Sequence, residues 1–181
     1  MSRIGKLPIT IPAGVTVEVN NNVVTVKGPK ATLTQDFSKN VSVEVNGNEV
    51  IVARKDESKD SNAKQGLYRQ LINNMITGVS AGFTKSLTVN GVGYKLAKQG
   101  TKLVMNLGLS HPVEFQEAEG ITFEIPDNTT ILVKGADKQL VGAYAAKIRA
   151  SRPVEPYHGY GIRYTNEVVI MKAGKSAGKK K

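Results

Sequence analysis

The feature that most constrains the fold is an internal repeat. Val15–Gly28 (VTVEVNNNVVTVKG) aligns with Ile121–Gly135 (ITFEIPDNTTILVKG) when the second copy is allowed one extra residue. The identical positions, first copy before second, are Thr16 and Thr122, Glu18 and Glu124, Asn22 and Asn128, Val26 and Val133, Lys27 and Lys134, and Gly28 and Gly135. Such self-similarity indicates a duplicated unit. We therefore expect two related halves with the same order of elements.

Alternating apolar and polar residues predict short strands in the first half. Val15–Val19 alternates and is followed by the turn-forming NNN, and VSVEV leads into Asn46-Gly47, a strong tight-turn pair. The period then changes, because apolar residues from Asn62 to Val79 recur every four positions. This spacing predicts an amphipathic helix, which Gly82 ends.

The second half repeats this order. The segment TKSLTVNGVGYKLAKQGTKLVMNLG alternates again, and further strands are expected up to Val133. A helix is expected from about Asp137 to Ala150, stopped by Pro153, and a last strand should end at EVVIM, residues 167–171. The fold class is therefore α+β, with two small homologous domains that each pack an antiparallel sheet against one helix. We expect the domains at 1–82 and 83–171, followed by a basic tail at 172–181.

Positive charge is concentrated in the last quarter of the chain. Residues 1–133 contain 14 basic and 12 acidic side chains, a net of +2, whereas residues 134–181 contain 11 and 3, a net of +8. Such asymmetry favours a polyanionic partner over a merely solubilising surface. The tail, KAGKSAGKKK, lacks acids and apolar periodicity, so we expect it to stay disordered until an anion binds it.

Catalytic and metal-binding patterns are lacking in the sequence. There is no cysteine, and the two histidines, His111 and His158, lie in neither a triad nor a helical metal pair. GKS at Gly174–Ser176 fails as a phosphate loop because Val169 occupies the position of its first glycine. We therefore expect no enzyme activity, no cofactor, no metal and no small-molecule substrate. No apolar run reaches the length of a membrane span, so a cytosolic, soluble protein is expected.

The stretch RPVEPYHGYGIRYTNEVV, residues 152–169, combines the groups that bind nucleic acid. Prolines stiffen it, glycines allow close approach, tyrosines offer stacking faces and arginines offer forked donors for phosphate. Two alternatives stay open here: Tyr157 and Tyr164 can instead fill the core, and the arginines can form a solvated surface. The candidate RNA-binding residues are Arg152, Tyr157, His158, Gly159, Tyr160, Gly161, Arg163, Lys172, Lys175, Lys179, Lys180 and Lys181.

The same stretch resembles the carboxy-terminal signature R-x-P-E-P-Y-K-G-K-G-[IV]-R-Y of the bacterial large-subunit ribosomal protein six family. The likeness extends over nearly the whole chain, through MSRIGKLPITIPAGVTV, LINNMITGVSAGFTKSLTVNGVGYKL, NLGLSHPVEF and VKGADKQLVGAYAAKIRASRPVEPY. This chain departs from the signature at His158 and Tyr160, where lysine is common, and at Val154, where proline is frequent. The two missing lysines leave open whether residues 158 and 160 contact RNA or whether the tail lysines take over.

The resemblance implies a function as well as a fold. It implies two domains made by duplication and binding to large-subunit ribosomal RNA, mainly through the carboxy-terminal domain, near the base of the factor-binding stalk. Neighbouring ribosomal proteins would be the other partners, with no membrane and no catalysis. A free-standing nucleic-acid-binding regulator remains the alternative, since it would share the basic end.

Overall fold

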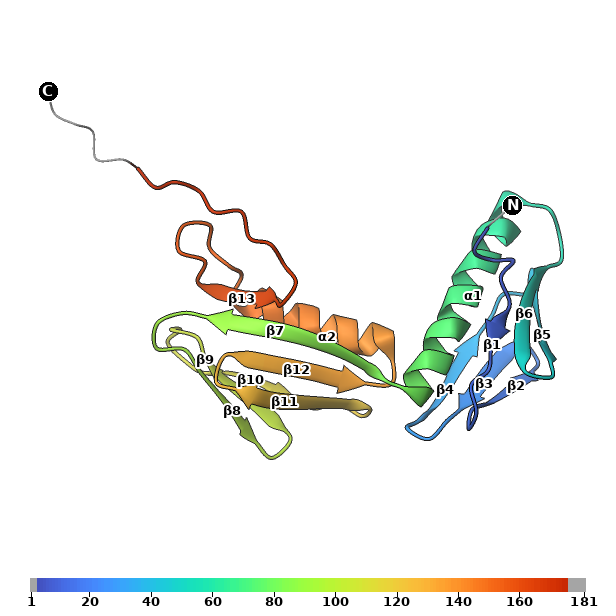
Figure 1. Cartoon of the computed structure of the whole chain (residues 1–181), viewed down its shortest axis with the longest axis horizontal. Coiled ribbons are helices and arrows are strands. Elements are labelled where there is room, and N and C mark those ends of the chain that lie inside the picture. Colours follow the sequence, from blue (N-terminus) through green and yellow to red (C-terminus); the bar gives the residue numbers. More distant parts are fainter. Residues whose placement is uncertain (1–2, 176–181) are drawn as a thin grey trace, which may run out of the picture. The chain divides into compact units, whose positions relative to one another are not determined.

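The computed structural model describes residues 3–175 (Figure 1). The chain divides into two compact units, Met1–Phe83 with Gly135–Lys138, and Thr84–Lys134 with the chain from Gln139 onwards. The described residues contain two helices and otherwise antiparallel strands, so the predicted α+β class is confirmed. Each copy of the internal repeat forms a pair of neighbouring hydrogen-bonded strands. These are β2 (Thr16–Asn20) and β3 (Val23–Lys27) in the first unit, and β11 (Ile121–Asp127) and β12 (Thr130–Gly135) in the second.

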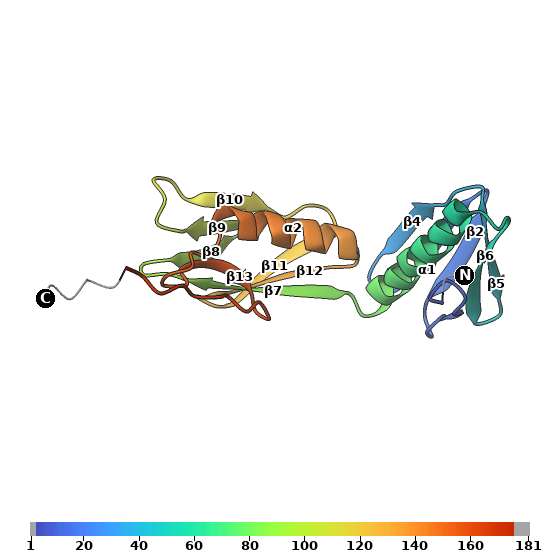
Figure 2. The same ribbon diagram turned by 90° about the horizontal axis from the view of Figure 1, so that it is seen from above.

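The first unit distributes its strands over two sheets instead of the single sheet expected. Its described part contains two three-stranded sheets, ordered β1-β6-β5 and β2-β3-β4. Helix α1 (Lys59–Ser80) packs against β3, β4 and β6, and Figure 2 shows it beside β4. The helix and both sheets contribute buried apolar side chains to one core. The strands are β1 (Ile9–Thr10), β2 (Thr16–Asn20), β3 (Val23–Lys27), β4 (Thr32–Asp36), β5 (Val41–Asn46) and β6 (Glu49–Arg54).

Helix α1 begins three residues earlier than the apolar period indicates, because its start is set by polar residues. The hydroxyl of Ser58 accepts a hydrogen bond from the backbone N–H of Ser61 at 3.1 Å, which is an N-cap contact. Asp56 in turn accepts hydrogen bonds from the backbone N–H and the hydroxyl of Ser58, at 3.0 and 2.6 Å. At the other end, Gly82 adopts a φ of +83°, which a glycine tolerates best.

The second unit also contains two sheets in its described part, β11-β12-β7-β13 and β10-β9-β8. Helix α2 (Lys138–Ser151) lies along the four-stranded sheet (Figures 1 and 2), and its Tyr144 ring lies 6.1 Å from the Phe123 ring of β11. The strands are β7 (Phe83–Asn90), β8 (Lys95–Gln99), β9 (Lys102–Asn106), β10 (Val113–Gln116), β11 (Ile121–Asp127), β12 (Thr130–Gly135) and β13 (Gly161–Tyr164). Its buried core includes Leu87, Phe123, Ile131, Val141, Ile148 and Ile162.

The last strand lies earlier than the sequence pattern indicates. Strand β13 covers only Gly161–Tyr164, where it pairs antiparallel with β7 and buries Ile162 completely. Residues 167–171, the EVVIM expected to end a strand, contain none, and Val168 and Ile170 are 88% and 83% exposed. A turn explains the difference, because the backbone N–H of Glu167 bonds to the carbonyl of Tyr164 at 2.9 Å and leads the chain off the sheet.

Candidate nucleic-acid interface

The candidate loop, residues 152–160, connects the end of α2 to β13. Its backbone is hydrogen-bonded to itself and to the strand that follows. The N–H of Glu155 donates to the carbonyl of Tyr160 at 3.0 Å, and the N–H of Gly159 donates to the carbonyl of Glu155 at 3.2 Å. The N–H of Ile162 donates to the carbonyl of Arg152 at 2.8 Å. The loop is therefore a closed and restrained structure.

Glu155 organises the tip of this loop, a role that the sequence pattern did not reveal. Its carboxylate accepts hydrogen bonds from the backbone N–H of His158 at 2.8 Å and of Tyr157 at 3.3 Å. The same carboxylate lies 3.1 Å from His158 Nδ1. Partial burial raises the pKa of Glu155, but these N–H groups outweigh it and leave the pKa below its ordinary value. The only sequence signal was a carboxylate placed three residues before the histidine.

Gly159 in the loop and Gly161 at the start of β13 both have a positive φ and close neighbours within the chain. Gly161 has a φ of +138°, and a Cβ placed on it would lie 2.6 Å from both the carbonyl oxygen of Pro153 and the Cα of Val154. Gly159 has a φ of +74°, and a Cβ there would lie 2.9 Å from the methyl carbon of Met171. Gly161 is therefore required for the close approach of the backbone, whereas Gly159 is favoured by its positive φ, because the Met171 side chain can move aside.

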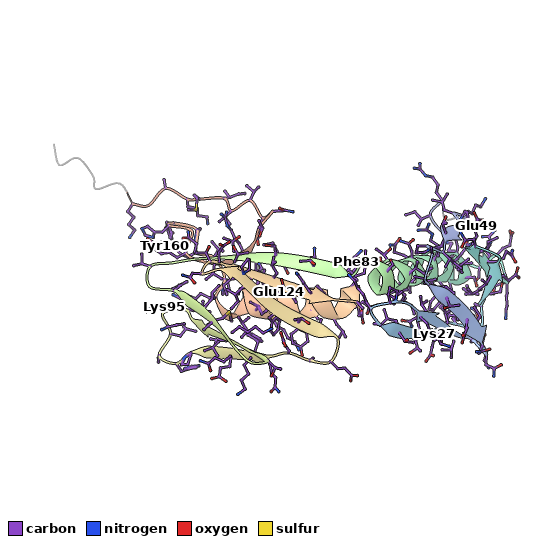
Figure 3. The ribbon with its side chains drawn as sticks, turned by 60° about the horizontal axis from the view of Figure 1, so that its bottom comes forward. Lys27, Glu49, Phe83, Lys95, Glu124 and Tyr160 are labelled. Atoms are coloured by element: carbon purple, nitrogen blue, oxygen red, sulfur yellow. The ribbon has the colours of Figure 1, made fainter. Side chains whose placement is uncertain are left out.

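The aromatic residues separate into exposed and packed members. Tyr157 and Tyr160 are exposed, and Tyr160 lies beside the end of β7 (Figure 3). The imidazole of His158 is stacked on the Tyr160 ring, with centroids 5.5 Å apart and an interplanar angle of 15°. Tyr164 is half-buried, with Arg149 and Lys85 cations 5.6 and 6.0 Å from its ring centroid. Tyr164 therefore has the packing role that the sequence left open.

Two arginines near the loop are already engaged. Arg149 forms a forked ion pair with Glu167, in which Nε donates to Oε2 at 2.8 Å and Nη2 donates to Oε1. The hydrogen bond from Arg149 lowers the pKa of Glu167, with further help from the N–H of Tyr164, and it raises the pKa of Arg149. Arg152 Nε donates to the hydroxyl of Tyr94 at 3.2 Å.

Arg163 differs from these two arginines, although its charge also helps to lower the pKa of Glu167. It lies on β13 opposite Thr88 of β7, and its guanidinium makes no hydrogen bond or ion pair with any residue between 3 and 175. Five donors on one unpaired guanidinium suit a phosphate. Arg163 therefore keeps all of its guanidinium donors, whereas Arg152 uses one on Tyr94.

The described part of the basic tail begins next to the loop. The backbone N–H of Lys172 donates to the carbonyl of Pro156 at 2.8 Å, which fixes the start of the tail against the loop. Lys172 and Lys175 are exposed. Lys179, Lys180 and Lys181, also predicted to bind RNA, lie outside the described residues.

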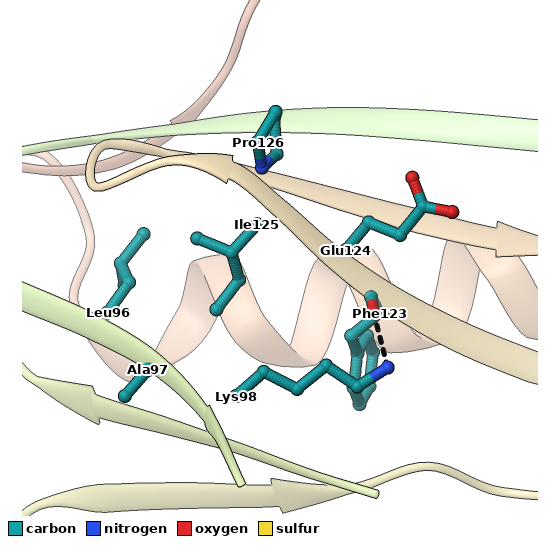
Figure 4. A pocket seen from close by; sticks show the side chains of 7 residues that line it. All are labelled: Leu96, Ala97, Lys98, Phe123, Glu124, Ile125 and Pro126. Atoms are coloured by element: carbon teal, nitrogen blue, oxygen red, sulfur yellow. Dashed lines mark hydrogen bonds between the residues drawn. The ribbon is translucent and has the colours of Figure 1, made fainter. Parts of the chain in front are cut away.

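An open cavity of about 470 Å³ between β8 and β11 offers no reactive group (Figure 4). Its lining includes Lys98, Phe123, Glu124 and Pro126. Lys98 Nζ donates to Glu117 Oε1 at 2.7 Å and to the carbonyl of Phe123 at 2.8 Å, and Glu124 pairs with Lys134 on β12. Both charged groups of the lining are therefore neutralised by partners within the unit.

Metal-binding clusters and membrane-spanning helices are both lacking in the part of the chain that the structure describes. No cluster of three or more His, Cys, Asp or Glu side chains within residues 3–175 is arranged to hold a metal ion. None of the helices in that range has both the length and the apolar character that crossing a membrane requires.

The repeated strand pairs, the two units and the closed loop together define a duplicated α+β protein. The chain belongs to the ribosomal protein L6 family, whose model matches residues 11–82 and 90–165. The resemblance found in the sequence is therefore confirmed, with one matched segment before Phe83 and one after it.

Relatives extend over the full chain. A protein from Desulfitobacterium hafniense (strain Y51) is 54% identical over 180 residues, which is 99% of this chain and 98% of the relative. One from Carboxydothermus hydrogenoformans is 53% identical over all of both chains, and one from Clostridium kluyveri is 55% identical over 99% of this chain and all of the relative. All three are named large ribosomal subunit protein uL6.

Proposed function

We propose that this chain is a structural component of the large ribosomal subunit that binds large-subunit ribosomal RNA near the base of the factor-binding stalk and so supports translation. The observation that carries the proposal is its 53–55% identity, over whole chains, to proteins named large ribosomal subunit protein uL6. The protein works in the cytoplasm as part of the ribosome, beside neighbouring ribosomal proteins, and catalyses no reaction itself.

The second unit is the main RNA-binding part, because it contains the excess of positive charge and the restrained loop. Residues 134–181 have 11 basic and 3 acidic side chains. Two of those acids are used internally, since Glu167 pairs with Arg149 and Glu155 holds the loop. The unpaired Arg163 and the exposed Lys172 and Lys175 remain available to neutralise phosphates.

The mechanism is recognition of RNA shape and phosphate by a surface that is ordered in advance. Hydrogen bonds within the loop fix its backbone before any ligand arrives. A restrained loop loses little conformational entropy on binding, so more of its interaction energy contributes to affinity. The cations then hold together RNA backbone segments that would otherwise repel one another.

Salt dependence tests this mechanism. With about six to eight phosphate contacts, the logarithm of the binding constant for large-subunit ribosomal RNA should fall with log salt at a slope of about −4 to −7. The measurement is a titration of the full-length protein against the extracted RNA at several potassium chloride concentrations. A slope near zero would contradict binding through phosphates.

The variant Arg163→Ala tests whether this arginine contributes one of the phosphate contacts. Loss of one phosphate contact should make the salt slope less steep by about 0.9 and weaken binding, while thermal unfolding is unchanged. Lys102→Ala is the matched control, because it removes one positive charge from β9, where Lys102 pairs with Glu114 at 3.4 Å. Equal effects of both variants would show that only overall charge matters.

Co-sedimentation separates the proposal from a free-standing nucleic-acid-binding regulator. The protein should remain with large ribosomal subunits through a sucrose gradient at moderate salt. RNA binding without co-sedimentation would favour the regulator instead.

A further inference from the structure

The stacked pair of His158 and Tyr160 has features that phosphate binding does not require. The rings are nearly parallel, at 15°, and 5.5 Å apart between centroids. Gly159 separates them in sequence, and its φ of +74° gives a turn in which the two flanking rings stack. The His158 side chain is 70% exposed and Tyr160 is 39% exposed. One face of the imidazole therefore covers the tyrosine and the other face is open to solvent.

Several hydrogen bonds hold the backbone around the pair. Glu155 accepts the N–H of His158 at 2.8 Å and lies 3.1 Å from Nδ1. The carbonyl of Tyr160 accepts the N–H of Glu155 at 3.0 Å, and Asn90 Nδ2 of β7 donates to the carbonyl of Gly159 at 3.3 Å. The stacked rings are therefore held in position before a ligand arrives, which lowers the entropy cost of binding.

The electrostatics of the pair favour a flat neutral ligand over a phosphate. The Glu155 carboxylate beside His158 would offset a positive imidazole and would repel a phosphate placed against it. A nucleobase has no net charge and two aromatic faces, and such bases stack on exposed aromatic rings of RNA-binding proteins. Cations for the flanking phosphates are close by, because Lys172 is bonded through its backbone to Pro156 of the same loop.

We propose that the His158–Tyr160 stack binds one unpaired nucleobase of RNA, which continues the stack on the open face of the imidazole. This inference rests on the proposed RNA-binding function. It assigns to residues 158 and 160 a contact with a base, in place of the phosphate contacts that lysines at these positions would make.

The test compares two RNA hairpins that differ by one nucleotide. One has a single bulged 2-aminopurine, whose fluorescence falls when it stacks, and the other is fully paired. The full-length protein should bind the bulged hairpin about tenfold more tightly and quench its fluorescence, as expected for one stacked base. His158→Ala with Tyr160→Ala should abolish the difference and the quenching while leaving the salt slope unchanged.

Two single variants control for the loop and for charge. Tyr157→Ala removes an exposed ring of the same loop outside the stack and should keep the preference for the bulge. His158→Lys should lose that preference and make the salt slope steeper by about one contact. Thermal unfolding of every variant should match the parent protein, because both rings of the stack are exposed.

Several outcomes would overturn the inference. These are equal binding of both hairpins by the parent protein, quenching that survives the double alanine variant, or failure to bind either hairpin. Equal binding that remains steeply salt-dependent would leave the proposed function intact, because phosphate contacts alone produce it. The proposed function is judged separately, by co-sedimentation with large subunits.

Discussion

Gly161→Ala should destabilise the second unit more than alanine at either Gly120 or Gly142. Two effects add at this position. The φ of +138° is unfavourable for alanine, at about 1–3 kcal/mol. A methyl group would also lie 2.6 Å from the backbone of Pro153 and Val154, and relieving such overpacking costs about 1–3 kcal/mol more. The expected loss in free energy of unfolding is about 2–6 kcal/mol.

The other two glycines separate these effects. Gly120 has a φ of +79°, but a Cβ placed on it would have nothing within 4 Å, so Gly120→Ala isolates the backbone strain at about 1–2 kcal/mol. Gly142 lies within α2, also with nothing within 4 Å, and Gly142→Ala should stabilise the unit by about 0.5–1 kcal/mol. From most to least stable, the order should therefore be Gly142→Ala, the parent protein, Gly120→Ala and Gly161→Ala.

Tyrosine fluorescence during urea unfolding is a suitable assay, because the chain has no tryptophan and five of its six tyrosines lie in the second unit. Those five are Tyr94, Tyr144, Tyr157, Tyr160 and Tyr164. For a unit of this size, about 2 kcal/mol corresponds to a fall in Tm of roughly 8–16 °C. A Gly161→Ala protein as stable as the Gly120→Ala protein would refute the close approach of Pro153 and Val154.

Two further predictions concern polar contacts that hold the elements. Glu167→Gln should destabilise the second unit by about 1 kcal/mol at neutral pH, because it weakens a partly exposed ion pair with Arg149. The pKa of Glu167 is lowered in the folded state, so this contribution to stability is present above the unfolded pKa and is lost as pH falls through the folded pKa. Urea unfolding at a series of acid pH values should therefore show a shrinking difference in free energy of unfolding between parent and variant. Ser58→Ala should lower the free energy of unfolding of the first unit by about 1 kcal/mol, since it removes the N-cap of α1. Ser42→Ala on β5 is the control for loss of a serine hydroxyl, and unfolding of both variants is followed by circular dichroism.

The sequence was sufficient for the elements that bury a regular apolar pattern. Helix α1 was located from residues spaced four apart, such as Met75 and Val79, with Ile72 and Ile76 beside them, because these four form its buried face. Its first turn was missed, since residues there are chosen for capping and have no apolar period. The division of each unit into two sheets was missed for a different reason, because alternation identifies a strand without identifying its neighbours.

Less of the candidate loop could be predicted from the sequence. Its exposed tyrosines and its glycines were recognisable from residue type, but the roles of Glu155 and Asn90 depend on contacts across a turn and between β7 and the loop. The apolar run at residues 167–171 indicated a strand. An apolar run in a sequence does not show, however, whether its side chains are buried. In the structure, the turn after Tyr164 directs Val168 and Ile170 into solvent.

The facing strands β8 and β11 bear on how separate copies of the protein avoid pairing with one another. Each is the edge strand of its sheet, and edge strands invite pairing with other copies. Pro126 on β11 has no N–H to donate, and Lys98 on β8 occupies the carbonyl of Phe123 with its ammonium group. A second copy therefore meets a strand that cannot extend a regular ladder at these positions. We therefore expect these two residues to disfavour edge-to-edge pairing between copies of the protein.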